Sequence, residues 1–379
     1  MSFRVISFFT LFFLSIIKFF GPERGFSDSG FNLYQIVGLI IFLTTTIVIN
    51  YINNAHKYDL NHFLLLFFTF AIISSLLSFN IISISYSMVF LINTICIYLI
   101  FTEPLKKIVY SSKYVPIFLV FLMLVQFYYY GVDIFGREVG NFEPNQFSIL
   151  ALCAISLNFF TSKNIISRSV ILIISFFLIM ITTSRGALGA SLIFLFTYSS
   201  MYIVKNYNFE KFFNYSTLLL LFLSAVVLLN LENVKLLLNG FSLYFELTSA
   251  DRGLQSGFTG RDILWINALD QFYNHPLLGS GLRNFDFRTH STYVLLLSET
   301  GILGLLTFLL FLISTLFNGF LKIFNSYDDQ INTSISFIVA MFFYAFIEKS
   351  VLLFTMPNSL LLFFFSAYIF HDKNNEKLH

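Results

Sequence analysis

The chain has 379 residues, of which 57% are hydrophobic and 11% are charged, and 53 of them are Phe. This composition provides too little polar surface to cover a soluble globule, so it indicates a polytopic membrane protein. The formal net charge of +2 is too small for a nucleic-acid-binding surface, and no nucleic-acid partner is expected.

Apolar runs long enough to cross a bilayer follow one another along the chain. Twelve membrane helices are predicted, at residues 4–20, 33–52, 60–79, 81–101, 114–130, 146–160, 165–183, 186–204, 215–231, 291–317, 331–347 and 351–370. Near Asn80, Arg185 and Glu348 the joins are so tight that one re-entrant element could replace two helices. The predicted fold is an all-α transmembrane bundle that forms a single integral membrane domain over residues 1–379.

The basic residues orient these helices. Alternation of the spans places twelve Lys and Arg residues on the side of both termini, against five in the short connections on the opposite side. Positive residues favour the cytoplasm, so both termini are predicted to be cytoplasmic. Most of the basic residues on the terminal side are Lys, whereas most on the outer side are Arg, whose planar fork grips phosphate oxygens. This bias favours an anionic substrate handled outside the cytoplasm, with chance in a small sample as the alternative.

Residues 232–290 are predicted to form the one long hydrophilic connection, on the outer side. Thr259 and Asp262 form a capping pattern that opens a short amphipathic helix, which Pro276 ends. After a flexible Gly279-Ser280-Gly281 turn, the chain reaches His290 directly before an apolar span. His290 is therefore expected at the mouth of a membrane helix.

Three outer residues are the predicted catalytic groups. Arg185 and Arg261 each stand at a predicted helix start, where amides and guanidinium could converge on a diphosphate. Snorkelling for Arg185 and a plain exposed loop position for Arg261 are the alternatives. A helix start also favours the neutral imidazole of His290, which can accept a proton, although a purely structural His is equally compatible with the pattern.

Further outer residues are predicted to bind substrate: Arg137, Asn145, Arg283 and Arg288. Glu299 lies half a helical turn out of phase with His290, so it is expected to serve packing and a buried hydrogen bond together with Gly301 and Gly304. No metal-ligand motif faces outward, so a metal-dependent transferase is disfavoured and no cofactor is expected.

Five segments in this order resemble the O-antigen ligase and polymerase superfamily of bacterial surface-polysaccharide assembly. They are residues 140–145 (GNFEPN), 183–186 (TSRG), 260–265 (GRDILW), 274–281 (NHPLLGSG) and His290 followed by 299–304 (ETGILG). The resemblance covers residues 140–306 well, although Ser291 stands where the family usually has Asn after the His.

The resemblance implies a metal-independent glycosyltransferase of the bacterial inner membrane, acting at the periplasmic face on glycans carried by undecaprenyl diphosphate. Arg185 and Arg261 would hold the diphosphate and His290 would serve the acceptor. Besides the lipid-linked donor and acceptor and the membrane lipids, a chain-length regulator protein is a possible partner. We predict an O-antigen polymerase, with a ligase that transfers the glycan to lipid A core as the first alternative. A transporter of a lipid-linked sugar is the second alternative, disfavoured because the charges collect on one face.

Overall fold

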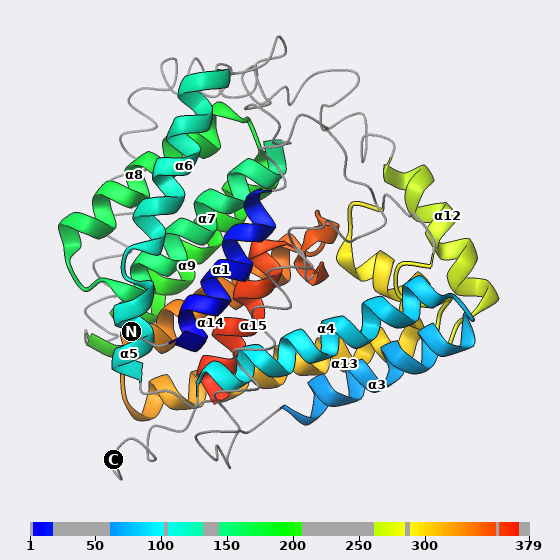
Figure 1. Cartoon of the computed structure of the whole chain (residues 1–379). Coiled ribbons are helices and arrows are strands. Elements are labelled where there is room, and N and C mark those ends of the chain that lie inside the picture. The colour runs from blue at the N-terminus through cyan, green and yellow to red at the C-terminus, as the bar shows by residue number, and fades with distance from the viewer. Residues whose placement is uncertain are drawn as a thin grey trace, which may run out of the picture.

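A computed structural model describes residues 3–17, 61–101, 105–131, 144–206, 261–284, 289–353 and 356–370 (Figure 1). These residues form helices and connecting turns, with no strand among them, so the predicted all-α class is confirmed for this part of the chain. The helices are α1 (Phe3–Ile17), α3 (His62–Leu77), α4 (Ile81–Ile100), α5 (Leu105–Ser112), α6 (Val115–Tyr130), α7 (Pro144–Thr161), α8 (Ile165–Ile181), α9 (Arg185–Asn206), α12 (Arg261–Asn274), α13 (Thr292–Asn325), α14 (Asp329–Tyr344), the 3-10 turn η3 (Lys349–Leu352) and α15 (Pro357–Phe370).

Four helical stretches in the described ranges are long and apolar enough to cross a membrane: Ile81–Ile100, Ile108–Tyr128, Arg185–Lys205 and Thr292–Asn325. Shorter apolar helices stand at four of the other predicted spans, as α3, α7, α8 and α15. The predicted spans 33–52 and 215–231, and the part of the predicted outer loop before Arg261, lie outside the described residues. The architecture is thus that of a helical membrane protein, and the count of twelve spans stays a prediction.

Polar residues cap the starts of four of these helices. The side chains of Asn61, Asn80, Asn164 and Asp328 each accept a hydrogen bond from the backbone amide two residues further on, at 2.8–2.9 Å. Such a cap stabilises a helix start by about 1 kcal/mol. The join at Asn80 therefore holds two separate helices, α3 and α4, as the span prediction had it.

α14 is the central helix of the packing. It contacts α9 most extensively and also packs on α7, α13 and α15, while α3 packs on α13 and α4 packs on α3 and α15 (Figure 1). Gly319 allows α13 to approach α14 closely, because a Cβ at this position would lie 2.7 Å from Cγ1 of Ile335. Phe side chains fill the interior, and Phe160 packs its ring against Phe364, Phe365 and Tyr368 of α15.

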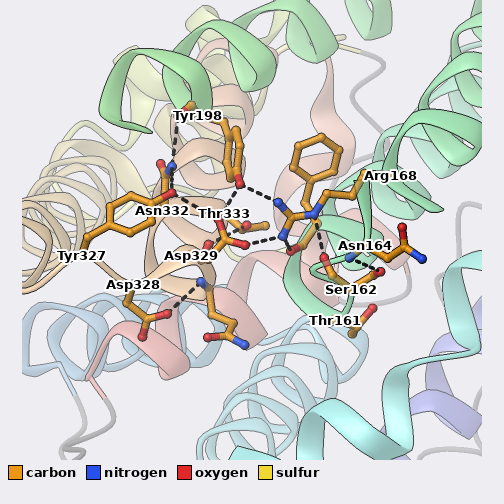
Figure 2. Close-up of polar contacts among 12 residues, drawn as sticks. Thr161, Ser162, Asn164, Arg168, Tyr198, Tyr327, Asp328, Asp329, Asn332 and Thr333 are labelled. Atoms are coloured by element: carbon orange, nitrogen blue, oxygen red, sulfur yellow. Dashed lines mark hydrogen bonds and ion pairs between the residues drawn. The ribbon is translucent and has the colours of Figure 1, made fainter. Parts of the chain in front are cut away.

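A polar network joins α8, α9 and α14 at one end of the bundle (Figure 2). The Arg168 guanidinium pairs with Asp329 and donates to the Tyr198 hydroxyl at 2.8 Å and to the Phe159 carbonyl at 2.8 Å. Its Nε donates to the Ser162 carbonyl at 2.6 Å. An Arg can satisfy this many acceptors at once because its five N–H groups form a rigid fork. The network thus joins the first turns of α8 and α14.

α13 differs from the uninterrupted span predicted for residues 291–317. It extends to Asn325, and Gly301 breaks it with φ 64° and ψ −169°, a conformation open to Gly but not to other residues. The chain segment before α13 fills the break: Pro276 accepts from Ile302 N at 2.9 Å and Leu277 accepts from Leu303 N at 3.3 Å. A Cβ on Gly301 would lie 2.4 Å from the Leu277 carbonyl carbon, so Gly is required for this approach as well.

The remaining differences lie in the connections. α15 begins at Pro357 instead of residue 351, because Pro suits the first turn of a helix and the preceding chain turns as η3. α5 occupies a connection for which no helix was predicted. These changes do not move the joins that carry the candidate site.

Candidate active site

His290 lies at the start of α13 with its two ring edges in different surroundings. The side chain is 39% exposed, yet its Nδ1 is buried and has no hydrogen-bond partner. Oε2 of Glu348 lies 3.9 Å from this Nδ1. The exposed part of the ring is therefore the side away from the carboxylate, which leaves Nε2 available to a substrate as a proton acceptor.

The backbone around His290 is held in an uncommon conformation. Its φ of 48° lies in the left-handed region, which costs a non-Gly residue roughly 1–2 kcal/mol. Hydrogen bonds on both sides fix it: the Thr289 hydroxyl donates to the Ser291 carbonyl at 3.0 Å, and Thr292 N donates to the Ala345 carbonyl at 2.8 Å. Ser291 is the N-cap residue of α13, and its side chain makes no capping hydrogen bond.

Glu348 connects His290 to two further helices. Its Oε1 accepts a hydrogen bond from the Asn145 side-chain amide, and its backbone carbonyl accepts from the Thr292 hydroxyl at 2.7 Å. Oδ1 of Asn145 in turn accepts from the Ser184 hydroxyl at 2.7 Å. A chain of polar contacts thus runs from the residue before Arg185, through α7, to the imidazole of His290.

Arg185 is the first residue of α9, as the sequence predicted for a helix start. The next residue, Gly186, packs on Tyr344 and Ile347, where its Cβ would meet side-chain atoms of both at 3.4 Å. Because Ile347 adjoins Glu348, the start of α9 and the carboxylate that faces His290 lie in the same part of the molecule. The free amides of a helix start favour an anion at this point.

Arg261 is the first residue of α12. One turn later on the same face of α12, the indole N–H of Trp265 donates to the Thr289 carbonyl at 2.6 Å. The short helix predicted to begin after Thr259 and to end before Pro276 is confirmed over residues 261–274, whereas its capping residue Thr259 lies outside the described residues.

The other predicted binding residues are placed differently. Asn145 is brought to the site, where its amide is occupied by Glu348 and Ser184. Arg283, in the loop before α13, lies beside a later part of that helix: its backbone N–H donates to Oε1 of Glu299 at 3.0 Å, and its guanidinium lies 5.7 Å from the Tyr86 ring centre. Glu299 is nine residues beyond His290, about 13 Å along a helix axis. Arg137 and Arg288 lie outside the described residues.

The buried hydrogen bond expected for Glu299 is confirmed, whereas the helix packing expected at Gly301 is not. Glu299 is buried and accepts a backbone hydrogen bond, and Gly301 permits a close approach, although the approaching segment is a loop and not a helix. The acidic partner of His290 is instead Glu348, which sequence reasoning did not assign to the site. The available signal was its position: Glu348 is the acidic residue in a tight join that span alternation places on the same side as His290.

These features define the class of protein: a helical membrane protein with a His–carboxylate pair beside two Arg-bearing helix starts. Residues 170–309 match the family model described as O-antigen ligase, and this match supports the resemblance to the O-antigen ligase and polymerase superfamily. The matched range contains Arg185, Arg261 and His290, whereas Asn145 and Glu348 lie outside it. A comparison with curated proteins gives no match.

Proposed function

We propose that the protein is an O-antigen polymerase, which joins oligosaccharide repeats carried on undecaprenyl diphosphate. The observation that carries the proposal is the pair of His290 and Glu348 beside the start of α9, because it combines a proton acceptor with an anion-binding helix end. The family match supports glycosyl transfer in glycan assembly as the broader activity.

In the proposed reaction, a hydroxyl oxygen of the acceptor sugar attacks the anomeric carbon of the donor glycan. As the new carbon–oxygen bond forms, the bond from that carbon to the diphosphate breaks and inverts the anomeric centre. The electron pair of the broken bond leaves with the lipid diphosphate. Nε2 of His290 takes the proton of the attacking hydroxyl, and Glu348 faces the positive charge that the imidazole gains.

The departing diphosphate needs positive charge near it. We assign this role to Arg185 and Arg261, each the first residue of a helix, where the helix amides add to the guanidinium. Charge stabilisation by fixed donors replaces a metal ion in this mechanism, and no cofactor takes part. We expect purified protein to extend lipid-linked repeats in excess chelator, and activity that only Mg²⁺ or Mn²⁺ restores would contradict the assignment.

We further propose that the site faces the periplasm and that both termini are cytoplasmic. Two observations support the placement of the site and the Arg168 network on opposite sides: Arg168 pairs with Asp329 near the start of α8, whereas Ser184 contacts Asn145 just beyond the end of this 17-residue helix. The assignment of the cytoplasmic side itself rests on the count of basic residues. A reporter that is active only in the periplasm should be silent after Lys377 and active near Ser256, and the reverse pattern would contradict the orientation.

The description of the matched family favours a second candidate, a ligase that transfers the glycan to lipid A core. Lipopolysaccharide gel profiles of a deletion strain separate the two. A polymerase defect leaves core carrying a single repeat, whereas a ligase defect leaves unmodified core and polymer still bound to its carrier. Loss of the ladder without either product would indicate that the chain forms no glycosidic bond.

A further inference from the structure

α12 is tied to α13 at two separate places. The first tie is the hydrogen bond from Nε1 of Trp265 to the carbonyl of Thr289, at 2.6 Å. Thr289 is fully buried and directly precedes His290. The indole of Trp265 therefore contacts the backbone that carries the proposed base.

The second tie lies beyond the other end of α12. The segment 276–281 forms hydrogen bonds with the backbone of α13 on both sides of Gly301. In addition to the bonds from Ile302 and Leu303, Ser280 N donates to the Ser298 carbonyl at 2.9 Å and Gly281 N donates to the Glu299 carbonyl at 2.8 Å. This end of α12 is thereby fixed to α13 through several bonds.

The spacing of the two ties gives Trp265 a mechanical role. Arg261 lies 14 residues before His275, about 20 Å along a helix axis. A helix held only at its far end would move its start by nearly 2 Å for a tilt of about 5°. Trp265 lies one turn from Arg261 on the same face of the helix, so a hydrogen bond there limits that tilt close to the start.

We propose that Trp265 is a positioning residue, which sets the start of α12, and with it Arg261, relative to His290. This inference rests on the proposed function, in which Arg261 holds the diphosphate of the donor while His290 takes the acceptor proton. Displacement of one group by about 1 Å can slow a reaction by about a hundredfold, because the reacting groups must be held together in one geometry.

The test replaces Trp265 by Phe, which keeps an aromatic ring but removes the N–H donor. The matched control is Tyr273→Phe, which removes a polar hydrogen from an exposed ring at the other end of α12. Hydrogen exchange of peptides covering residues 261–266 measures how firmly the helix start is held. Binding of undecaprenyl diphosphate and the turnover of lipid-linked repeats measure the effect on the site.

We expect Trp265→Phe to speed exchange at residues 261–266 by about fivefold and to weaken undecaprenyl diphosphate binding by about tenfold, as one lost hydrogen bond allows. Turnover should fall by at least the same factor, while the thermal midpoint stays near that of Tyr273→Phe. Trp265 is the chain's only Trp, so the unaltered protein offers a second measurement. Its fluorescence should change when undecaprenyl diphosphate binds.

Two results would overturn the inference. In the first, exchange at residues 261–266 is the same in both variants; in the second, exchange is faster but diphosphate affinity and turnover match those of Tyr273→Phe. Failure of the proposed function has a different signature. In that case the unaltered protein forms no polymer but still binds undecaprenyl diphosphate, and the Trp265→Phe variant binds it more weakly. The positioning role of Trp265 then stands without the polymerase assignment.

Discussion

The carboxylate of Glu348 offers a sharp test of the proposed base. Glu348→Gln preserves the shape of the side chain, and its amide oxygen can still accept the hydrogen bond from Asn145. The bond from Thr292 goes to the Glu348 backbone and is also kept. The substitution therefore removes one negative charge that faces His290 and changes little else.

The magnitude follows from the distance of 3.9 Å between Nδ1 of His290 and Oε2 of Glu348. Two unit charges at this separation attract by about 1 kcal/mol in water and by about 4 kcal/mol at an effective dielectric constant of 20. Because 39% of the His290 side chain is exposed, solvent screening keeps the value in the lower half of this range. A loss of about 1–2 kcal/mol from the transition state slows turnover roughly five- to thirtyfold.

The assay compares turnover of lipid-linked repeats with the affinity for undecaprenyl diphosphate. We expect kcat to fall and donor affinity to stay within about twofold, because Glu348 faces the group that becomes charged only as the proton moves. The control is Asp270→Asn, which removes an exposed carboxylate from α12. Unchanged kcat in Glu348→Gln, or a loss confined to donor affinity, would refute the role of this carboxylate.

Three further substitutions test other parts of the site. His290→Ala should slow transfer about a hundred- to ten-thousandfold with donor affinity kept, and loss of donor binding instead would contradict its role as a base. Arg185→Lys should be nearly as damaging to turnover as Arg185→Ala, since Lys keeps the charge but loses the bidentate fork; full activity of the Lys variant would exclude that geometry. Gly301→Ala should lower the stability of the detergent-solubilised protein by more than about 2 kcal/mol in thermal unfolding, because its backbone has φ 64° and its Cβ would lie 2.4 Å from Leu277. A thermal midpoint equal to that of the parent protein would show that the break in α13 tolerates a side chain.

The sequence predicted the helices most accurately where a local signal marks their ends. α4 was expected at residues 81–101 and covers Ile81–Ile100, because Asn80 caps its start. α8 is similarly bounded by its cap Asn164 and by the turn before Arg185. The C-terminal end of α13 could not be predicted from such a local signal. Its last two turns lie beyond the predicted span 291–317 and are held by contacts with the rest of the bundle.

The break in α13 was missed for a physical reason. A Gly inside an apolar run usually permits close packing of helices, and the role of Gly301 was predicted in these terms. What breaks the helix is the docking of residues 276–281, a contact between separate segments that no periodicity within α13 records. α5 was missed for a different reason: a short amphipathic helix of 8 residues has little signal of its own in the sequence.

The candidate site was predicted in part. Arg185 and His290 were predicted to stand beside helix starts, a feature that turn and capping residues reveal, and the structure has both there; their catalytic roles stay predictions. Glu348 was not assigned, because its relation to His290 depends on how α13 meets the turn after α14 across many residues of chain. Asn145 was predicted to bind substrate, whereas in the structure its amide links Glu348 to Ser184.

The docking of residues 276–281 into α13 also constrains the order of assembly. The ribosome makes this segment before it makes its partners at positions 298–303, so the ladder between them cannot form until the first part of α13 has emerged. Inside the hydrocarbon region of a membrane, no water is available to form hydrogen bonds with the backbone groups next to the break at Gly301. Membrane insertion of α13 and docking of residues 276–281 onto it are therefore coupled events. A change in the length of this loop should lower the yield of assembled protein in the membrane, before any substrate is bound.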